Sequence, residues 1–210
     1  MAVTDNFNRA NETPLASPWG SNTVDPEFKL VSNAAQPDNV FQDCSSRHTT
    51  AGLSADQYAQ AKVSMTTGGD AGAGPGVTVR AASNAKTYYR LACQKTSPAV
   101  ELSRFNAGTY TFLATRTVTW SDGDTFRVEV SGTGSTVTLK IFRNGSQLGA
   151  DISDSDGNRI TAAGSPGIAF SSGSVVTASV DDFEAGDLER GQGFNQQLLR
   201  PRQFAPGLAR

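Results

Sequence analysis

The stretch at residues 123–147, GDTFRVEVSGTGSTVTLKIFRNGSQ, decides the fold of this chain. Apolar and polar residues alternate along positions 126–130 and again along positions 137–141. A period of two is typical of a β-strand that buries one face and exposes the other. The Asn-Gly pair at 144–145 is a strong hairpin signal. The stretch therefore predicts antiparallel strands joined by tight turns.

The same period recurs along the chain at positions 59–65, 77–80 and 89–93. Gly, Ser and Thr contribute 21 residues each, 63 of 210 or 30%, whereas Lys and Glu together number 11. This composition disfavours helical bundles and favours strands with Gly- and Ser-rich turns. We expect an all-β fold, a two-sheet antiparallel sandwich. Its predicted interior residues are Val63, Val79, Leu91, Val128, Leu139 and Phe170.

The charge pattern predicts neither a nucleic-acid nor a membrane partner. The 18 basic and 20 acidic residues leave a net charge of −2, without the basic stripe of an electrostatic nucleic-acid binder. No apolar run approaches the roughly 20 residues of a membrane span, and the first residues do not form a secretory signal. We therefore expect Cys44 and Cys93 to be reduced thiols, with Cys93 buried, and their pairing in an oxidising medium is the alternative.

The composition changes near residue 184, because neither Ser nor Thr occurs after Ser179. We interpret residues 1–184 as one sandwich domain and residues 185–210 as an extended C-terminal arm, too short for a domain and too apolar for a flexible linker. Large apolar side chains are costly to leave in water, so the arm is expected to dock on a partner. The predicted docking residues are Phe194, Leu198, Leu199, Arg200, Arg202, Phe204, Leu208 and Arg210.

Short motifs at both ends of the predicted domain carry a family resemblance. The chain opens with Asp5-Asn-Phe-Asn-Arg-Ala10, followed by Trp19, and the domain closes with Ser179-Val-Asp-Asp-Phe183. Over residues 5–184 the chain resembles the concanavalin A-like jelly roll in its laminin-G-like form. The resemblance implies that the first and last strands, and these two motifs, lie side by side. It leaves the function open, because this fold serves lectins, hydrolases, adhesins and structural proteins.

The opening motif also resembles accessory virion proteins of tailed bacteriophages, and residues 200–210 are similar to the C-terminal tails of phage structural proteins. This resemblance implies a non-enzymatic virion structural protein that is assembled in the host cytoplasm. Its expected partners are capsid or tail subunits and further copies of itself. We expect a capsid decoration (cement) protein anchored through its arm. The alternative is a carbohydrate-binding module of a tail or fibre that binds a surface glycan, and a glycan hydrolase is a further alternative.

Candidate residues for catalysis or metal binding are sparse. Hydrolases of the resembled family carry paired carboxylates as Glu-x-Asp-x-x-Glu, and that spacing does not occur, so no catalytic residue is expected. We interpret His48, the one histidine, as a loop residue rather than a catalytic base. Asp151, Asp154 and Asp156 predict a polar turn rather than a calcium loop, since no Glu follows them nearby. We expect no metal ion and no cofactor.

Five aromatic residues are candidates for stacking on a sugar ring. Trp120 directly precedes a polar turn and is expected at an exposed rim, where a glycan can contact it. Trp19 is expected to pack in the core instead. The remaining candidates are Tyr58, Tyr88 and Tyr110.

Overall fold

The computed structural model of the chain describes residues 2–22, 24–66, 72–173 and 177–188. These residues form strands throughout, and none of them forms a helix long and apolar enough to cross a membrane. The strands are β1 (Ala2–Asp5), β2 (Trp19–Gly20), β3 (Phe28–Val31), β4 (Ala34–Pro37), β5 (Cys44–His48), β6 (Gln57–Met65), β7 (Gly74–Ala81), β8 (Tyr88–Gln94), β9 (Ala99–Asn106), β10 (Thr109–Thr117), β11 (Asp124–Ser131), β12 (Val137–Arg143), β13 (Ser146–Gln147), β14 (Ile152–Asp154), β15 (Ser165–Ser171) and β16 (Ala178–Asp187).

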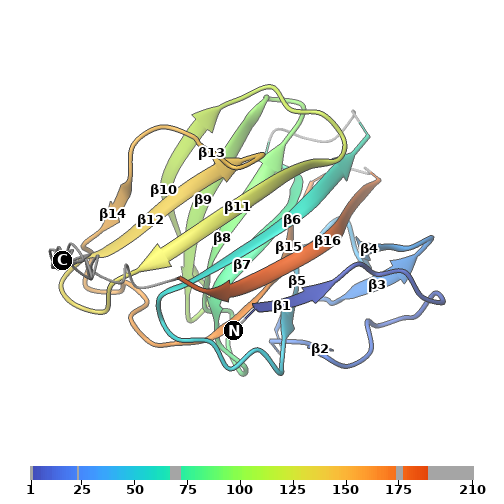
Figure 1. Ribbon diagram of the computed structural model, residues 1–210, viewed down its shortest axis with the longest axis horizontal. Coiled ribbons are helices and arrows are strands. Elements are labelled where there is room, and N and C mark those ends of the chain that lie inside the picture. The colour runs from blue at the N-terminus through green and yellow to red at the C-terminus, as the bar shows by residue number, and fades with distance from the viewer. Residues whose placement is uncertain (1, 23, 67–71, 174–176, 189–210) are drawn as a thin grey trace, which may run out of the picture.

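Two antiparallel sheets pack face to face (Figure 1). Sheet A has the order β13-β12-β11-β6-β16-β4-β3, with β1 paired to β16 and β14 paired to β12. Sheet B has the order β10-β9-β8-β7-β15-β5-β2. Many neighbouring strands are distant in the sequence, so the chain crosses repeatedly between the sheets, as it does in a jelly roll. The predicted all-β sandwich is confirmed.

The core lies between the inner faces of the two sheets. The six residues predicted to be interior are each at most 1% exposed. The stretch that predicted the fold forms β11 and β12, in which Val128 lies opposite Ile141. Asn144 and Gly145 connect β12 to the short β13 with φ angles of 48° and 80°. Asn and Gly adopt this left-handed backbone more readily than other residues.

The first strand closes sheet A by pairing with the last, so that Asp5 lies opposite Phe183. The Asp5 carboxylate then accepts hydrogen bonds from the Phe7 backbone N–H at 2.8 Å, the Arg9 guanidinium at 2.8 Å and the Trp19 indole N–H at 2.7 Å. The Trp19 ring packs 5.0 Å from the Phe183 ring and is 5% exposed. Both expectations, the adjacent end strands and the buried Trp19, are confirmed.

His48 is the last residue of β5, and its interpretation as a loop residue is wrong. It is 4% exposed, and its ring centroid lies 5.4 Å from that of Trp19. Burial lowers the pKa of His48, which favours the neutral form of the buried ring. This strand was not predicted, because Cys-Ser-Ser-Arg-His does not alternate between apolar and polar residues. Its inward-facing residues are nevertheless buried.

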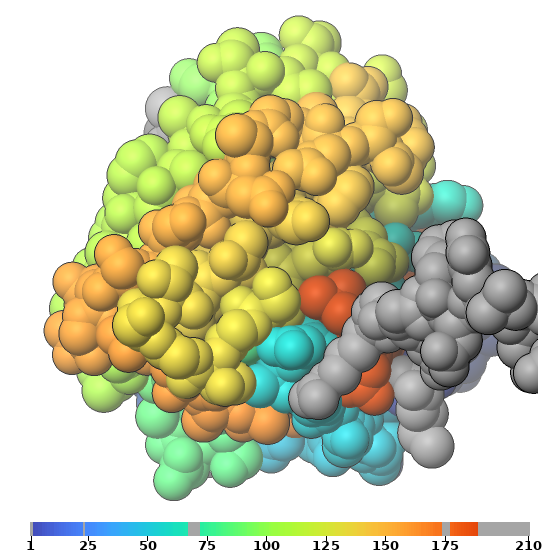
Figure 2. Space-filling view, turned by 60° about the vertical axis from the view of Figure 1, so that its left-hand side comes forward, coloured from blue at the N-terminus to red at the C-terminus, as the bar shows by residue number. Residues whose placement is uncertain are grey.

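The outer face of sheet A is polar. In Figure 2, β16 (red) lies at the floor of a hollow beside β6 (cyan) and β11 (yellow). The hollow has a volume of about 680 Å³, and Gly186 contributes to its lining. The guanidinium of Arg127 stacks 3.5 Å above the ring of Tyr58, and Arg127 also pairs with Glu129 at 2.7 Å. Arg127 therefore covers one face of the Tyr58 ring, and a ligand cannot stack on that face.

Sheet B differs because its central strands β7 and β8 are buried along their whole length. Small residues meet around Gly76, which lies opposite both Ala92 on β8 and Ala169 on β15. A Cβ atom on Gly76 would lie 1.7 Å from the Leu91 carbonyl oxygen, so no side chain fits there. The glycine therefore allows the backbones of β7 and β8 to approach closely at this point.

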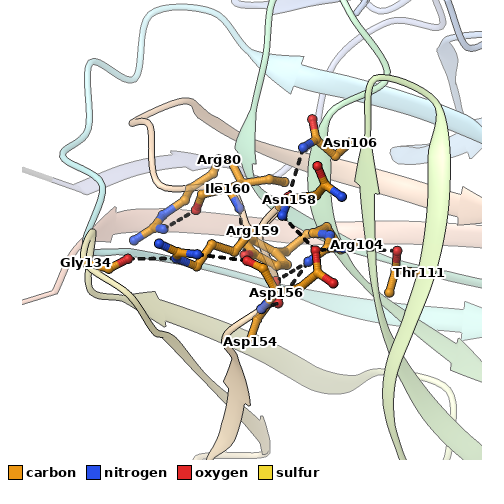
Figure 3. A network of polar contacts seen from close by, with 11 residues as sticks. Arg80, Arg104, Asn106, Thr111, Gly134, Asp154, Asp156, Asn158, Arg159 and Ile160 are labelled. Carbon is orange, nitrogen blue, oxygen red and sulfur yellow. Dashed lines mark hydrogen bonds and ion pairs between the residues drawn. The ribbon is translucent and has the colours of Figure 1, made fainter.

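A buried ion pair ties the end of β14, and with it the segment that follows, to the β9–β10 hairpin (Figure 3). Arg104 and Asp154 have side chains 3% and 2% exposed, and their N–O distances are 2.8 and 2.9 Å. Arg104 also donates to the Thr111 hydroxyl at 3.2 Å. The Tyr89 hydroxyl donates to Asp154 at 2.8 Å and accepts from the Ile160 backbone N–H at 3.0 Å. These contacts fix the hairpin relative to the segment after β14.

Cys44 and Cys93 are free and buried, as expected of reduced thiols. They lie on β5 and β8, which are separated by β15 and β7 in sheet B. Three strand spacings amount to about 14 Å, whereas a disulfide needs Cα atoms within about 7 Å. An internal disulfide between them is therefore geometrically excluded.

We predict that removing one member of the Arg104–Asp154 pair destabilises the protein strongly. Asp154→Ala leaves a buried guanidinium without its carboxylate, which costs about 3–5 kcal/mol of unfolding free energy. Lys140→Ala removes an exposed ion pair with Asp151 and should change stability little. Urea unfolding monitored by fluorescence measures both variants. Equal stability of the two would contradict a structural role for the buried pair.

We also predict that both thiols are unreactive in the native state. Burial raises the pKa of Cys44 to about 11 and raises the pKa of Cys93 well above its ordinary value. The thiolate is the reactive form, so Ellman's reagent at pH 8 should label neither thiol within minutes, and both after unfolding in guanidinium. Rapid labelling of the folded protein would show that one of the strands opens readily.

Candidate functional site

Two acidic and two basic side chains meet on the outer face of sheet B. The Lys86 ammonium lies 3.0 Å from a carboxylate oxygen of Asp25 and 3.0 Å from one of Asp43. The Arg90 guanidinium lies 3.1 Å from the other oxygen of Asp43. We call these four residues the Arg90 cluster. Its formal charges balance, so it presents hydrogen-bonding groups rather than a net charge.

Asp25 anchors this cluster to the sheet. Its carboxylate is 8% exposed and accepts hydrogen bonds from the Tyr88 hydroxyl at 2.8 Å, the Ser45 hydroxyl at 3.0 Å and the Asn22 amide at 2.9 Å. Burial, with the charge of Asp25, raises the pKa of Tyr88, so its hydroxyl keeps the proton that it donates. The loop before β3 is thereby held against sheet B.

Arg90 has a buried hydrogen-bond donor without a partner. It is 3% exposed, and within the described part of the chain its Nε atom makes no hydrogen bond, whereas its Nη1 atom forms the ion pair with Asp43. The hydroxyl of Ser103, its cross-strand neighbour on β9, is also buried and unpartnered there. Buried polar groups are nearly always hydrogen-bonded to protein or water. The outer face of sheet B therefore has polar groups whose hydrogen bonds are not made within the described part of the chain.

Aromatic rings continue the face toward the β10 edge. The ring of Phe105 lies under the cations of the cluster, 4.5 Å from Lys86 Nζ and 4.8 Å from Arg90 Cζ. The Tyr110 ring packs edge-on against Phe105 at 5.5 Å. Tyr110 is 46% exposed and Phe112, two residues further along β10, is 52% exposed. The two rings share one side of the strand and form an open aromatic surface.

Glu101 on β9 fixes the position of Tyr110. It accepts a hydrogen bond from the Tyr110 hydroxyl at 3.0 Å and another from the Gln94 amide at 3.3 Å. Burial and the bond to Glu101 raise the pKa of Tyr110 to about 12, so the phenol is protonated at neutral pH. The ring is thus held in place beside a carboxylate that can accept further hydrogen bonds.

The most exposed large apolar side chains of the described residues lie on β10 or near the cluster acids in the sequence. Two of them lie on β10, and the other two lie within two residues of the acids of the Arg90 cluster. These four side chains are Val24, Phe41, Tyr110 and Phe112. Exposed apolar side chains that gather on one face, with polar groups between them, are typical of a binding surface.

Asp25 and Asp43 form a carboxylate pair that the sequence spacing did not reveal. A glycosidase needs one such group protonated near neutral pH, as a general acid. Burial would raise the pKa of Asp43, but Arg90, the Ser172 backbone N–H and Lys86 outweigh burial and lower it. Asp43 therefore carries no proton at neutral pH, and the cluster is better suited to binding than to proton transfer.

The three aspartates predicted to form a polar turn are engaged in ion pairs. Asp154 and Asp156 contact Arg104 at 2.8 and 3.3 Å, and Asp151 contacts Lys140 at 3.7 Å. Within residues 2–22, 24–66, 72–173 and 177–188, no group of three or more His, Cys, Asp or Glu side chains is placed to hold a metal ion.

Trp120 is 4% exposed, so its expected position at an exposed rim is wrong. Its indole N–H donates to the Gln94 carbonyl at 2.7 Å, and its ring packs edge-on against Phe126 at 5.9 Å. A residue next to a polar turn can still point inward when its N–H finds a carbonyl. Of the other stacking candidates, Tyr110 alone is both on the face described above and exposed. The eight predicted docking residues of the arm lie outside the described residues.

Comparisons with known proteins identify the fold without naming a family. No family model matches the sequence, and no curated protein matches it. A carbohydrate-binding module of Bacillus subtilis, CBM66, superposes with a TM-score of 0.60 at 15% identity, over 80% of this chain and 94% of that one. The exoplasmic/lumenal domain of VIP36, in its Ca²⁺/Man-bound form, superposes with a TM-score of 0.56 at 13% identity, over 82% and 84% of the two chains.

A legume lectin-like domain from Entamoeba histolytica is also similar, with a TM-score of 0.51 and 14% identity over 78% of this chain and 88% of that domain. At these identities the likeness concerns the fold. The described part of the chain is therefore a two-sheet jelly-roll sandwich of the kind found in lectin-like domains and carbohydrate-binding modules.

Proposed function

We propose that this chain is a non-enzymatic carbohydrate-binding module whose site lies on the outer face of sheet B. The observation that carries the proposal is the exposed pair Tyr110 and Phe112 beside the half-buried carboxylate of Glu101 and the buried guanidinium of Arg90. The similarity in fold to a carbohydrate-binding module and to lectin-like domains supports it. The proposal also gives a use to the exposed apolar side chains on β10.

A sugar needs two kinds of contact, and this face has both. The C–H side of a sugar ring packs on an aromatic ring, and its hydroxyls exchange hydrogen bonds with a few fixed polar groups. Tyr110 and Phe112 provide the rings, spaced about 7 Å along β10. Glu101 provides an acceptor, and Lys86 of the Arg90 cluster, whose side chain is 16% exposed, provides a donor beyond it.

The aromatic surface is preorganised, which favours binding. Tyr110 is held by Phe105 on one side and by Glu101 through its hydroxyl. Fixing a side chain before the ligand arrives removes an ordering cost of about 0.5–1.5 kcal/mol from binding. A weakly binding ligand such as a glycan benefits most from this saving.

Placement of this module on a phage particle, as a capsid decoration protein or as part of a tail or fibre, stays a prediction from the sequence. A glycan-binding face and a docking arm are compatible, because they use different parts of the chain. Of the functions expected from the sequence, carbohydrate binding is the one proposed here.

We predict that Tyr110→Ala and Phe112→Ala each weaken glycan binding at least about tenfold, or about 1.4 kcal/mol. Each change removes a stacking surface, while the exposed position leaves the core intact. Binding of the purified full chain to an array of plant, bacterial and animal oligosaccharides identifies the glycan. Isothermal titration with the strongest binder then measures each variant.

Tyr58→Ala is the matched control, because Tyr58 is a partly exposed tyrosine on the outer face of sheet A. It should bind glycan as the unmodified chain does, and thermal melts should show all three variants folded. Loss of binding in Tyr58→Ala but not in Tyr110→Ala would move the site to sheet A. Release of reducing sugar during the assay would contradict the non-enzymatic assignment.

A further inference from the structure

A pocket of about 270 Å³ opens at the rim of the sandwich, next to the aromatic surface. Its walls come from the β9–β10 hairpin and from the segment after β14 (Figure 3). The lining residues are Arg104, Asn106, Ala107, Thr109, Thr111 and Asn158. The volume is below the roughly 300–1,000 Å³ of pockets for drug-sized ligands. It therefore suits a group about the size of one sugar.

The chemistry of this pocket is polar, and it carries no net positive charge, because two carboxylates face one guanidinium. Arg104 is held by Asp154 at 2.8 Å and by Asp156 at 3.3 Å, so its charge is compensated. Its Nε atom is buried and has no hydrogen-bond partner within the described part of the chain. The Asn106 amide donates to the Asn158 carbonyl at 2.9 Å, which leaves its own oxygen as an acceptor. Amides, hydroxyls and a neutralised guanidinium match hydroxyl groups better than they match an anion.

Residues that line the pocket alternate along β10 with residues of the aromatic surface. Thr109 and Thr111 line the pocket, whereas Tyr110 and Phe112 face outward from sheet B. Consecutive Cα atoms are about 3.8 Å apart, so a ligand that contacts one set lies within a sugar's length of the other. A ligand that uses both must cross the free edge of β10.

The edge of β10 is open to such a ligand. β10 is the terminal strand of sheet B and, among the described strands, pairs with β9 alone. It has nine residues, whereas the edge strands β2 and β13 have two each and β3 has four. Its outward backbone N–H and C=O groups are therefore available to hydrogen-bond sugar hydroxyls.

We infer that the ligand is a neutral oligosaccharide of at least two units that crosses the β10 edge. One sugar stacks on Tyr110 and Phe112, and a second places its hydroxyls in the pocket between Thr109 and Asn158. This inference rests on the proposed carbohydrate-binding function and adds the class and the minimum length of the ligand. Since neither the Arg90 cluster nor the pocket carries a net positive charge, uncharged sugars are favoured over acidic ones.

The test compares ligand lengths in two sets of variants of the full chain. The probes are oligosaccharides of one to four units, cut from the strongest neutral binder on the glycan array. Affinity should rise at least about tenfold between one unit and two or three. The double variant Thr109→Val/Asn158→Ala removes a hydroxyl and an amide at exposed positions. It should abolish most of that rise and leave binding of the single sugar within about twofold.

Thr117→Val, an exposed threonine at the other end of β10, is the matched control and should keep the full length dependence. Raising the salt concentration from 50 to 500 mM should change the affinity less than about twofold, because an uncharged sugar forms no ion pair with the protein. If Tyr110→Ala abolishes binding but the double variant keeps the length dependence, the pocket is not used and the inference fails while the proposed function stands. Salt-sensitive binding of acidic glycans alone would overturn the assignment to neutral sugars, and absence of any glycan binding would overturn both proposals.

Discussion

The buried ion pair between Arg104 and Asp154 is the constraint on which the binding region depends. It joins the β9–β10 hairpin to the end of β14, and its position is further fixed by the Tyr89 hydroxyl. A buried ion pair contributes little net stability compared with an apolar pair, but leaving one charge alone is costly. The pair therefore specifies one arrangement of the hairpin. Both the aromatic surface and the rim pocket are carried by that hairpin.

Paired charges also fix the arrangement of the outer face of sheet B. Charges buried there are matched one against another. The matching is incomplete, because Arg90 and Ser103 keep unpartnered donors. Natural proteins depart from complete hydrogen bonding mainly at functional sites. The location of these atoms beside exposed rings agrees with a binding role.

The sequence predicted the sandwich where alternation was strict, as in β11 and β12. It failed at His48, because a strand of small polar residues has no apolar period, and at Trp120, because adjacency to a turn does not determine where a ring points. The Arg90 cluster was not predictable, because Asp25 and Asp43 reach β8 from two separate loops. Tyr110 was among the stacking candidates, but its selection required the exposure and the neighbours that tertiary structure provides.

The ends of the described chain and the proposed binding surface lie on different sheets. β1 and β16, where the described chain begins and ends, both belong to sheet A, whereas Tyr110 and Phe112 lie on the terminal strand of sheet B. A chain joined to a larger assembly through either end is therefore connected through sheet A. Under the proposed function, a glycan bound at the β10 edge therefore lies on a different sheet from both ends of the described chain.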